Sequence, residues 1–405
     1  SGARAGRGRH AQRDQRSHRA RARRAVVIMR LFVASGIFHP EPGGPATYLH
    51  RLLPELQARG HEVRLLTFGD APAEGYPYPV TRIPRRFLPL RFAHYARAAR
   101  PLAQWSDLIF ANSLGLPLIA LPRRPRVLKV VGDLAWERAV NRGWVPPTED
   151  IDAFQTRRYD RRVMLLKRQR SREVRRADAV IVPSEYLRKM VIGWGAPPER
   201  VTVIYNALSP DAAASTRSQA ETRVALRLPP GPLLLTVARL TAWKGVDTLL
   251  RALARVPDVR LLIAGDGPEE ARLRALADTL DLGERAQFLG RVDRATLAGY
   301  FRAADYTALY SGYEGLPHVL LESLLSGTPV IASDKGGNPE VVRHDENGLL
   351  VRYPDEDALV AALERAFSGE TRARLAAGSN AGLERFRWAA MVEQTVALLE
   401  KAGER

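Results

Sequence analysis

The sequence predicts an α/β protein built from two doubly wound, parallel-sheet domains. Short apolar strands alternate with helical stretches along both halves of the 405-residue chain, and such alternation implies parallel strands with helices on both faces. The alternation stops at 206–232, a stretch rich in Ala, Ser and Pro, and then restarts. An amphipathic segment from Phe386 to Leu399 closes the chain. We therefore expect two sheets, a linker and a terminal helix.

The first half begins with a β-rich apolar segment at 26–35, followed by a loop containing Gly43 and Gly44. Leucines then recur at helical spacing up to Gly60, a plausible helix end. Further strands are expected at 61–67, 107–111, 126–131 and 179–183. These elements predict a Rossmann-like domain over 29–205.

The second half repeats the pattern. We expect strands at 233–238, 259–264 and 286–289, with helices at 246–256 and 269–281. An apolar segment ending at Tyr310, a turn, a helix from His318 to Leu325 and an inner strand at 330–332 follow. The predicted second domain covers 206–385 with its linker at 206–232, and residues 386–405 form the terminal helix.

Composition excludes several classes of protein. Apolar residues make up 45% and charged residues 26% of the chain, values typical of a soluble globular protein. No apolar run reaches the roughly 18 residues that cross a bilayer. The chain has no cysteine, which excludes a thiol nucleophile, disulfides and cysteine metal sites.

The net charge of +18 is concentrated in two segments. Residues 1–28 hold nine Arg and one Asp, lack apolar periodicity and are expected to be disordered, whether or not they are native. Residues 155–176 hold ten Lys or Arg and two acidic residues, with Arg157, Arg161 and Arg168 near one helical face. Such a helix either lies on an anionic membrane or presents a solvated face.

Two motifs in the second half carry chemistry. Arg239 and Lys244 lie where the domain's first strand ends, and cations there suit a diphosphate whose negative charge grows as a bond breaks. Glu314 and Glu322 frame the mouth of the later strand–helix–strand unit, where open α/β sheets bind ligands. Solvated charges are the alternative for each motif taken alone.

Together these motifs resemble the donor site of the family four glycosyltransferases, retaining enzymes of the GT-B fold. That fold has two Rossmann-like domains facing across a cleft and a C-terminal helix that crosses back to the first domain. The resemblance is strongest over 310–350, good around 239–244 and weak over 70–160.

The resemblance implies a role for each matching residue. Arg239 and Lys244 would hold the diphosphate, Glu322 the ribose, and Glu314 the donor sugar. The donor set implied by the matches is Gly43, Gly44, Arg239, Lys244, Gly267, Arg291, Val292, Glu314, Gly315, Leu316 and Glu322. For the glycines, a tight turn is the structural alternative. Neither a metal nor a cofactor is expected beside the nucleotide sugar.

The acceptor side departs from the family. Many relatives carry a His where this chain has Gly132, followed here by Asp133. Asp133 either acts in catalysis, by orienting the acceptor or stabilising the anomeric centre, or caps a helix beginning near Leu134. Asn112 is expected to face the cleft, and Trp136 lines an acceptor groove or belongs to the core.

The resemblance implies transfer of a hexose from a UDP- or GDP-sugar to a hydroxyl of a glycan or lipid-linked acceptor, with an α-linkage. Catalysis would involve Asp133, Glu314, Arg239 and Lys244. We expect a role in surface polysaccharide or glycolipid synthesis, in the cytoplasm or peripherally on the inner membrane face. The alternatives are a GT-B epimerase, a glycogen-type synthase, or a non-enzymatic binder of glycans or nucleic acid; sequence-specific nucleic-acid binding is not expected.

Overall fold

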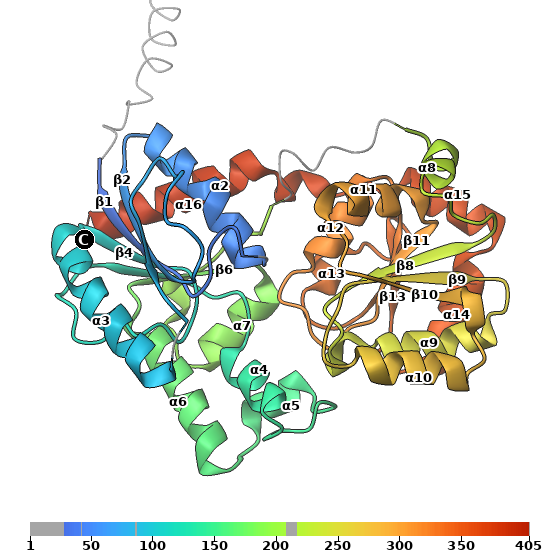
Figure 1. Cartoon of the computed structure of the whole chain (residues 1–405), viewed down its shortest axis with the longest axis horizontal. Coiled ribbons are helices and arrows are strands. Elements are labelled where there is room, and N and C mark those ends of the chain that lie inside the picture. Colours follow the sequence, from blue (N-terminus) through green and yellow to red (C-terminus); the bar gives the residue numbers. More distant parts are fainter. Residues whose placement is uncertain (1–27, 42, 86, 208–216, 405) are drawn as a thin grey trace, which may run out of the picture.

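A computed structural model describes residues 28–41, 43–85, 87–207 and 217–404. Two lobes lie side by side, each with a central sheet and helices around it (Figure 1). The predicted basic tail lies outside the described residues except for Ile28. The predicted α/β class with two parallel sheets is confirmed.

The first lobe contains a seven-stranded sheet in the order β3-β2-β1-β4-β5-β6-β7, with every neighbouring pair parallel. Its strands are β1 (Arg30–Ala34), β2 (Glu62–Phe68), β3 (Val80–Ile83), β4 (Leu108–Ala111), β5 (Arg126–Lys129), β6 (Ala179–Val182) and β7 (Val201–Val203). Its helices are α2 (Gly44–Ala58), α3 (Leu88–Trp105), α4 (Leu134–Asn141), α5 (Ile151–Thr156), α6 (Arg161–Arg176), α7 (Glu185–Gly193) and the short η1 (Pro198–Arg200).

The second lobe contains a six-stranded parallel sheet in the order β10-β9-β8-β11-β12-β13. Its strands are β8 (Leu233–Val237), β9 (Arg260–Ala264), β10 (Ala286–Gly290), β11 (Tyr306–Leu309), β12 (Val330–Ser333) and β13 (Gly348–Val351). Its helices are α8 (Gln219–Ala225), η2 (Ala242–Lys244), α9 (Val246–Arg255), α10 (Glu270–Thr279), η3 (Gly283–Arg285), α11 (Arg294–Ala303), α12 (His318–Leu325), α13 (Asn338–Val341), α14 (Glu356–Ala366), α15 (Gly369–Ala377) and η4 (Leu383–Phe386).

The terminal helix α16 (Trp388–Gly403) runs back across the first lobe (Figure 1). Its buried face packs into the same apolar cluster as α2 and strands β1, β2 and β4. Met391, Val392 and Leu399 are among its buried residues. The predicted crossover of the C-terminal helix is confirmed, and it fastens the end of the chain to the lobe where the chain begins.

Each central strand is buried on both faces, so its sequence is apolar throughout rather than alternating. The strand β4 is wholly buried, as are β11 and β12. Separate apolar clusters lie on the two faces of the first sheet. In open sheets of this kind, ligands bind in the cleft at the carboxyl ends of the central strands, and the loops there form its walls.

The segment 206–232, which the sequence predicts as the linker, contains a helix. Residues 208–216 lie outside the described part of the chain, but α8 occupies 219–225 within it. Ser218 and Glu221 form a reciprocal capping box at its start, and α8 packs against α11 of the second lobe. The second lobe therefore begins before the end of the predicted linker.

Candidate functional site

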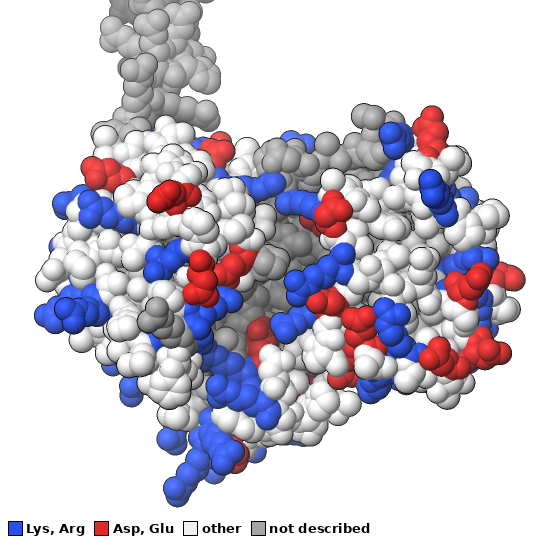
Figure 2. Space-filling model, viewed as in Figure 1, with Lys and Arg blue, Asp and Glu red and all other residues white. Residues whose placement is uncertain are grey.

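A cavity of about 300 Å³ lies in the cleft and takes its walls from both lobes. Figure 2 shows a hollow between the lobes with basic and acidic side chains along it. The walls come from the loops and helix starts that follow strands β1, β5, β7, β8 and β11, the edge where doubly wound sheets bind ligands. Its lining residues are Gly44, Pro45, Tyr48, Lys129, Val131, Glu137, Asn206, Arg239, Thr241, Trp243, Lys244, Tyr313, Glu314, Gly315, Leu316 and His318.

Arg239 and Lys244 reach the cavity from the turn after β8. Lys244 Nζ donates to Glu314 Oε1 at 2.6 Å, so the predicted cation and carboxylate form one pair. The turn is held closed at Gly245, whose φ is 63° and whose added Cβ would lie 2.0 Å from the Tyr310 carbonyl oxygen. Only glycine fits there, and the turn fixes the position of Lys244.

The turn Glu314–Leu316 lies directly against the first lobe. A Cβ at Gly315 would lie 2.5 Å from the carbonyl oxygen of Val131, which follows β5. The Glu314 carbonyl accepts a hydrogen bond from Gly337 N at 2.8 Å, which ties the turn to the loop before α13. Any side chain at Gly315 would therefore press on the backbone of the opposite lobe.

Gly43 and Gly44 differ in their relation to the cavity. Gly44 begins α2 and lines the cavity. Gly43 is the preceding residue and does not line it, but its φ of 145° favours glycine at the helix start. Gly44 therefore brings the N-terminus of α2 to the cleft, whereas Gly43 shapes the turn before it.

Four other predicted donor residues do not line this cavity. Glu322, on α12, pairs with Arg294 at 3.3 Å, and burial raises the pKa of its carboxyl against the opposing charges of Arg294 and Arg51. Arg291 pairs with Asp266 at 2.7 Å. Of the others, Val292 packs on an apolar cluster and Gly267 allows its backbone to approach Leu240 closely.

Asp133 is a buried helix cap. Its carboxylate accepts hydrogen bonds from the backbone N–H groups of Ala135 and Trp136 at 3.0 and 3.2 Å. It also accepts one from the Gln155 amide at 3.0 Å and forms an ion pair with buried Arg170. Because both oxygens are occupied and Asp133 does not line the cavity, the structure corresponds to the capping alternative.

Asn112 and Trp136, the other candidates for the acceptor side, do not line the cavity either. Asn112 is buried and donates to the Pro45 carbonyl at 3.2 Å, so it supports the loop after β1. The Trp136 ring is buried 5.1 Å from the Trp243 ring and 5.4 Å from the Tyr313 ring. Trp136 therefore belongs to the core, at a contact between the lobes.

Sequence reasoning missed Lys129 and Glu137 among the ionisable residues of the cavity wall, which also include His318, Tyr48 and Tyr313. Burial lowers the pKa of Lys129 to about 7. Burial and the neighbouring Asp133 raise the pKa of Glu137 to about 7, against the opposing charges of Lys244, Arg138 and Arg239. The available signal was position, since both residues follow or end a strand at the ligand-binding edge.

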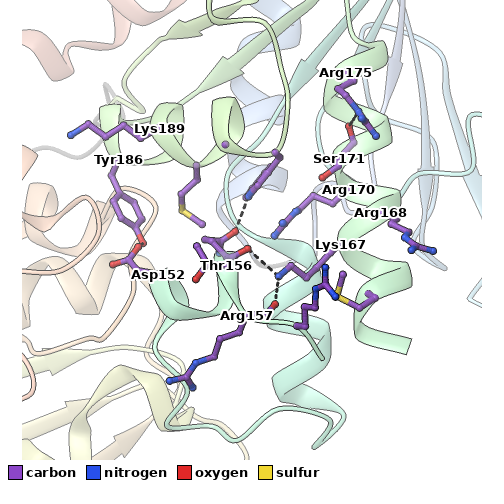
Figure 3. A pocket seen from close by; sticks show the side chains of 16 residues that line it. Asp152, Thr156, Arg157, Lys167, Arg168, Arg170, Ser171, Arg175, Tyr186 and Lys189 are labelled. Carbon is purple, nitrogen blue, oxygen red and sulfur yellow. Dashed lines mark hydrogen bonds between the residues drawn. The ribbon is translucent and has the colours of Figure 1, made fainter. Parts of the chain in front are cut away.

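A second cavity of about 740 Å³ lies in the first lobe between α5, α6 and α7. Figure 3 shows Arg168, Arg170 and Arg175 extending from α6, with Tyr186 and Lys189 on α7. Its basic lining residues are Arg157, Arg158, Lys167, Arg168, Arg170, Arg175 and Lys189, whereas Asp152 alone is acidic. This cavity has a strongly positive wall within the predicted basic segment.

Two other kinds of feature are absent from the described residues. No helix among them is long and apolar enough to cross a bilayer. They contain no cluster of three or more His, Asp or Glu side chains arranged to hold a metal ion.

Two Rossmann-like lobes, a cleft at their strand ends and a returning terminal helix define the GT-B class. Residues 42–212 match the model of Glycosyltransferase Family 4, and residues 218–382 match that of Glycosyl transferases group 1. The chain belongs to the family four glycosyltransferases of the GT-B fold.

Curated relatives match part of the chain. A D-inositol 3-phosphate glycosyltransferase of Mycobacterium marinum is 33% identical over 237 residues, 56% of this chain and 50% of that protein. An uncharacterized glycosyltransferase of Methanocaldococcus jannaschii is 32% identical over 197 residues, 47% of this chain and 50% of that protein. The chain spans about half the length of the curated relatives it matches.

Solved structures match a larger share of the chain than these relatives do. The sucrose-phosphate synthase of Thermosynechococcus elongatus has a TM-score of 0.76 and 25% identity, covering 92% of this chain and 98% of that one. Anabaena HepE in complex with UDP-glucose has a TM-score of 0.73 and 24% identity, covering 92% and 100%. The similarity to HepE shows that the two chains share a fold.

Proposed function

We propose that the protein is a retaining glycosyltransferase that moves a hexose from a nucleoside diphosphate sugar to an acceptor hydroxyl. The observation that carries this proposal is the meeting of Arg239 and the Lys244–Glu314 pair with the α2 N-terminus at Gly44 in one cavity. Cations and backbone N–H groups stabilise the negative charge that a leaving diphosphate gains. This cavity has both.

The proposed donor extends from the cavity along the second lobe. Its diphosphate contacts Arg239 and Lys244, and its sugar contacts Glu314 and the turn at Gly315. Glu322 binds the ribose, and the residues near the nucleobase are Gly267, Arg291 and Val292. UDP is the first nucleotide to test, because HepE was solved with UDP-glucose; GDP is the second.

The proposed chemistry uses neither a protein nucleophile nor a metal. The acceptor oxygen attacks the anomeric carbon from the face that the diphosphate leaves, which gives an α-linkage. Arg239 and Lys244 supply the positive charge that the leaving group requires. Closure of the lobes excludes water and limits loss of the donor.

The proposed acceptor is a glycan or lipid-linked glycan presented at an anionic membrane surface on the cytoplasmic side. The basic wall between α5, α6 and α7 supports this part of the proposal (Figure 3). Arg158, Arg168 and Lys189 have no acidic partner within the described part of the chain. Each basic residue near such a surface contributes about 1 kcal/mol of attraction.

A vesicle assay tests the membrane part. The triple variant Arg158→Ser, Arg168→Ser and Lys189→Ser is expected to lose binding to phosphatidylglycerol vesicles at low salt, while neutral phosphatidylcholine vesicles bind neither protein. A control with Arg274→Ser, in the second lobe, should bind as the unaltered chain does. Equal binding by the triple variant would remove this surface from the proposal.

A thermal-shift panel of UDP- and GDP-sugars tests the donor. A ligand that binds the folded state raises the melting temperature, and at a given concentration the rise grows with the logarithm of its affinity. We expect one nucleotide sugar to stabilise the protein, and Lys244→Ala and Glu322→Ala to abolish transfer while each variant stays folded. Activity retained in both variants would contradict the donor-site assignment.

A further inference from the structure

Glu137 is the carboxylate that the first lobe presents to the cleft cavity. It lies in the first turn of α4, four residues after the capping Asp133. It lines the cavity together with Arg239, Lys244 and Glu314 from the second lobe. Neither the predicted donor set nor the predicted acceptor set includes it.

The backbone at Gly132 makes room for this carboxylate. A Cβ added at Gly132 would lie 2.6 Å from Glu137 Oε1 and 3.2 Å from the Tyr313 hydroxyl oxygen. A side chain at 132 would therefore occupy the position that the Glu137 carboxylate holds. Gly132 keeps the carboxylate at the contact between the lobes.

Of the two carboxylates in the cavity wall, Glu137 is the unpaired one. Glu314 accepts a hydrogen bond from Lys244 at 2.6 Å, and the buried Asp133 behind the wall pairs with Arg170. Within the described residues, no hydrogen bond or ion pair reaches the Glu137 side chain. A partly buried carboxylate without a partner is costly, which makes a bound hydroxyl a favourable partner.

The charges around Glu137 come from several elements. Asp133 and Arg138 flank it on α4, and Lys244 and Arg239 face it from the second lobe. Tyr313 lies beside it, and the cavity also contains Glu314, Lys129, Tyr48 and His318. Burial is the largest influence and raises the pKa of Glu137 to about 7. A carboxylate with such a pKa can take up and release protons near neutral pH.

We infer that Glu137 binds the attacking hydroxyl in the cleft and accepts its proton during transfer. This inference rests on the proposed function. The acceptor oxygen forms a bond to the anomeric carbon, and the bond between that carbon and the diphosphate oxygen breaks. The electron pair leaves with the diphosphate, and the hydroxyl proton moves to a Glu137 oxygen.

Hydrolysis of UDP-glucose tests the inference, because water then serves as the attacking hydroxyl and no natural acceptor is needed. In the unaltered protein, kcat/KM should fall about tenfold per pH unit below about pH 7, as Glu137 becomes protonated. Glu137→Gln should lose this acidic limb, and its rate of hydrolysis should fall by a factor of about 10² to 10⁴. Its Kd for UDP-glucose should stay within about twofold. Deprotonation of Lys129 would give an alkaline limb instead.

Gly132→Ala is a second variant that leaves Glu137 in the chain. Its new methyl group should displace the carboxylate, so hydrolysis should fall while UDP-glucose binding persists. Gly369→Ala is the matched control, since a Cβ there meets nothing within 4 Å. Glu199→Gln, at an exposed glutamate, is the control for the loss of charge.

The outcomes separate the inference from the proposed function. If Glu137→Gln keeps the rate and the acidic limb, the inference fails although the unaltered protein binds and hydrolyses UDP-glucose. A Kd raised tenfold or more, with hydrolysis lowered in proportion, would make Glu137 a donor contact and overturn it too. If the unaltered protein neither binds nor hydrolyses UDP- or GDP-sugars, the proposed function itself fails.

Discussion

Lys129 ends β5 inside the wall of the cleft cavity. Its side chain is buried, and Nζ lies 4.2 Å from the centroid of the Tyr48 ring. No hydrogen-bond partner reaches Nζ among the described residues. A cation–π contact offsets part of the cost of burying an ammonium group, yet burial still lowers the pKa of Lys129 to about 7.

Lys129→Met is expected to make stability less dependent on pH. Because burial lowers the folded-state pKa to about 7 from the ordinary lysine pKa of 10.5, the unfolded chain holds more protons between these values, and stability rises with pH across that window. The variant should therefore melt above the unaltered protein at pH 7, and its advantage should shrink toward pH 10. Differential scanning calorimetry at several pH values measures this. If the difference in melting temperature between the two proteins did not change with pH, burial would not lower the pKa of Lys129.

The start of α4 depends on one residue. Asp133 caps the helix and also neutralises Arg170, which is 4% exposed and stacks on Trp194 with its guanidinium carbon 4.1 Å from the ring centroid. Loss of one member of a buried pair leaves the other charge uncompensated. The cap and the ion pair therefore stabilise the same junction behind the cavity wall.

Asp133→Ala should lower the free energy of unfolding by about 3–5 kcal/mol, the cost of leaving a buried charge unpaired. Urea titration measures it. Asp150→Ala is the matched control, because Asp150 caps α5 through the N–H groups of Asp152 and Ala153 but is solvent-accessible. The control should lose about 1 kcal/mol, the usual worth of a cap. Equal losses in the two variants would contradict the buried ion pair.

The returning helix α16 should contribute to the first lobe's stability. Leu399 is 1% exposed within the apolar cluster shared with α2 and the strands. Leu399→Ala should cost about 2–5 kcal/mol, as for other buried leucines, whereas exposed Glu393→Ala should cost little. If Leu399→Ala melted like the control, the packing of α16 on the first lobe would be wrong.

Strands and helices with a clear apolar pattern could be predicted from the sequence, whereas short edge strands and the short helix α8 could not. The predicted strands at 233–238 and 259–264 correspond to β8 and β9, and all but one residue of each observed strand is apolar, so their type could be predicted. The short β3 and β7 lie at the edges of the first sheet, where weak apolar character suffices. The capping box of α8 was present at Ser218, but the surrounding Ala, Ser and Pro favoured a linker.

In the site too, some residues could be predicted from local sequence and others could not. Local sequence predicted Arg239, Lys244 and Glu314 because each lies in a motif after a strand. It could not choose between the two roles of Asp133, since Arg170 lies 37 residues away in the sequence. Nor could it select Glu137, because its position depends on Gly132 and on Tyr313 of the opposite lobe.

At the scale of the whole molecule, Glu340 joins the two lobes. Its carboxylate accepts hydrogen bonds from the N–H groups of Glu185 and Tyr186 at 2.9 Å each, at the start of α7. The Tyr205 hydroxyl donates to it at 3.1 Å. A carboxylate at a helix N-terminus is favoured by the unpaired N–H groups and the helix dipole. In this structure, the helix belongs to the opposite lobe.

Glu340→Ala should let the lobes separate more readily. We expect a larger radius of gyration by small-angle X-ray scattering, and a larger decrease when UDP-glucose closes the cleft. Glu364→Ala, on the exposed face of α14, is the control. An unchanged radius in both ligand states would show that this contact does not hold the lobes.

Isothermal titration of UDP-glucose tests the central claim, that the cleft cavity binds a nucleotide sugar, most directly. We predict one binding site per chain in the unaltered protein. Lys244→Ala should weaken binding at least about tenfold, since hydrogen bonds to charged groups contribute about 1.5–3 kcal/mol. The control Lys401→Ala, exposed on α16, should bind normally. Binding equal in Lys244→Ala and the control would contradict the account.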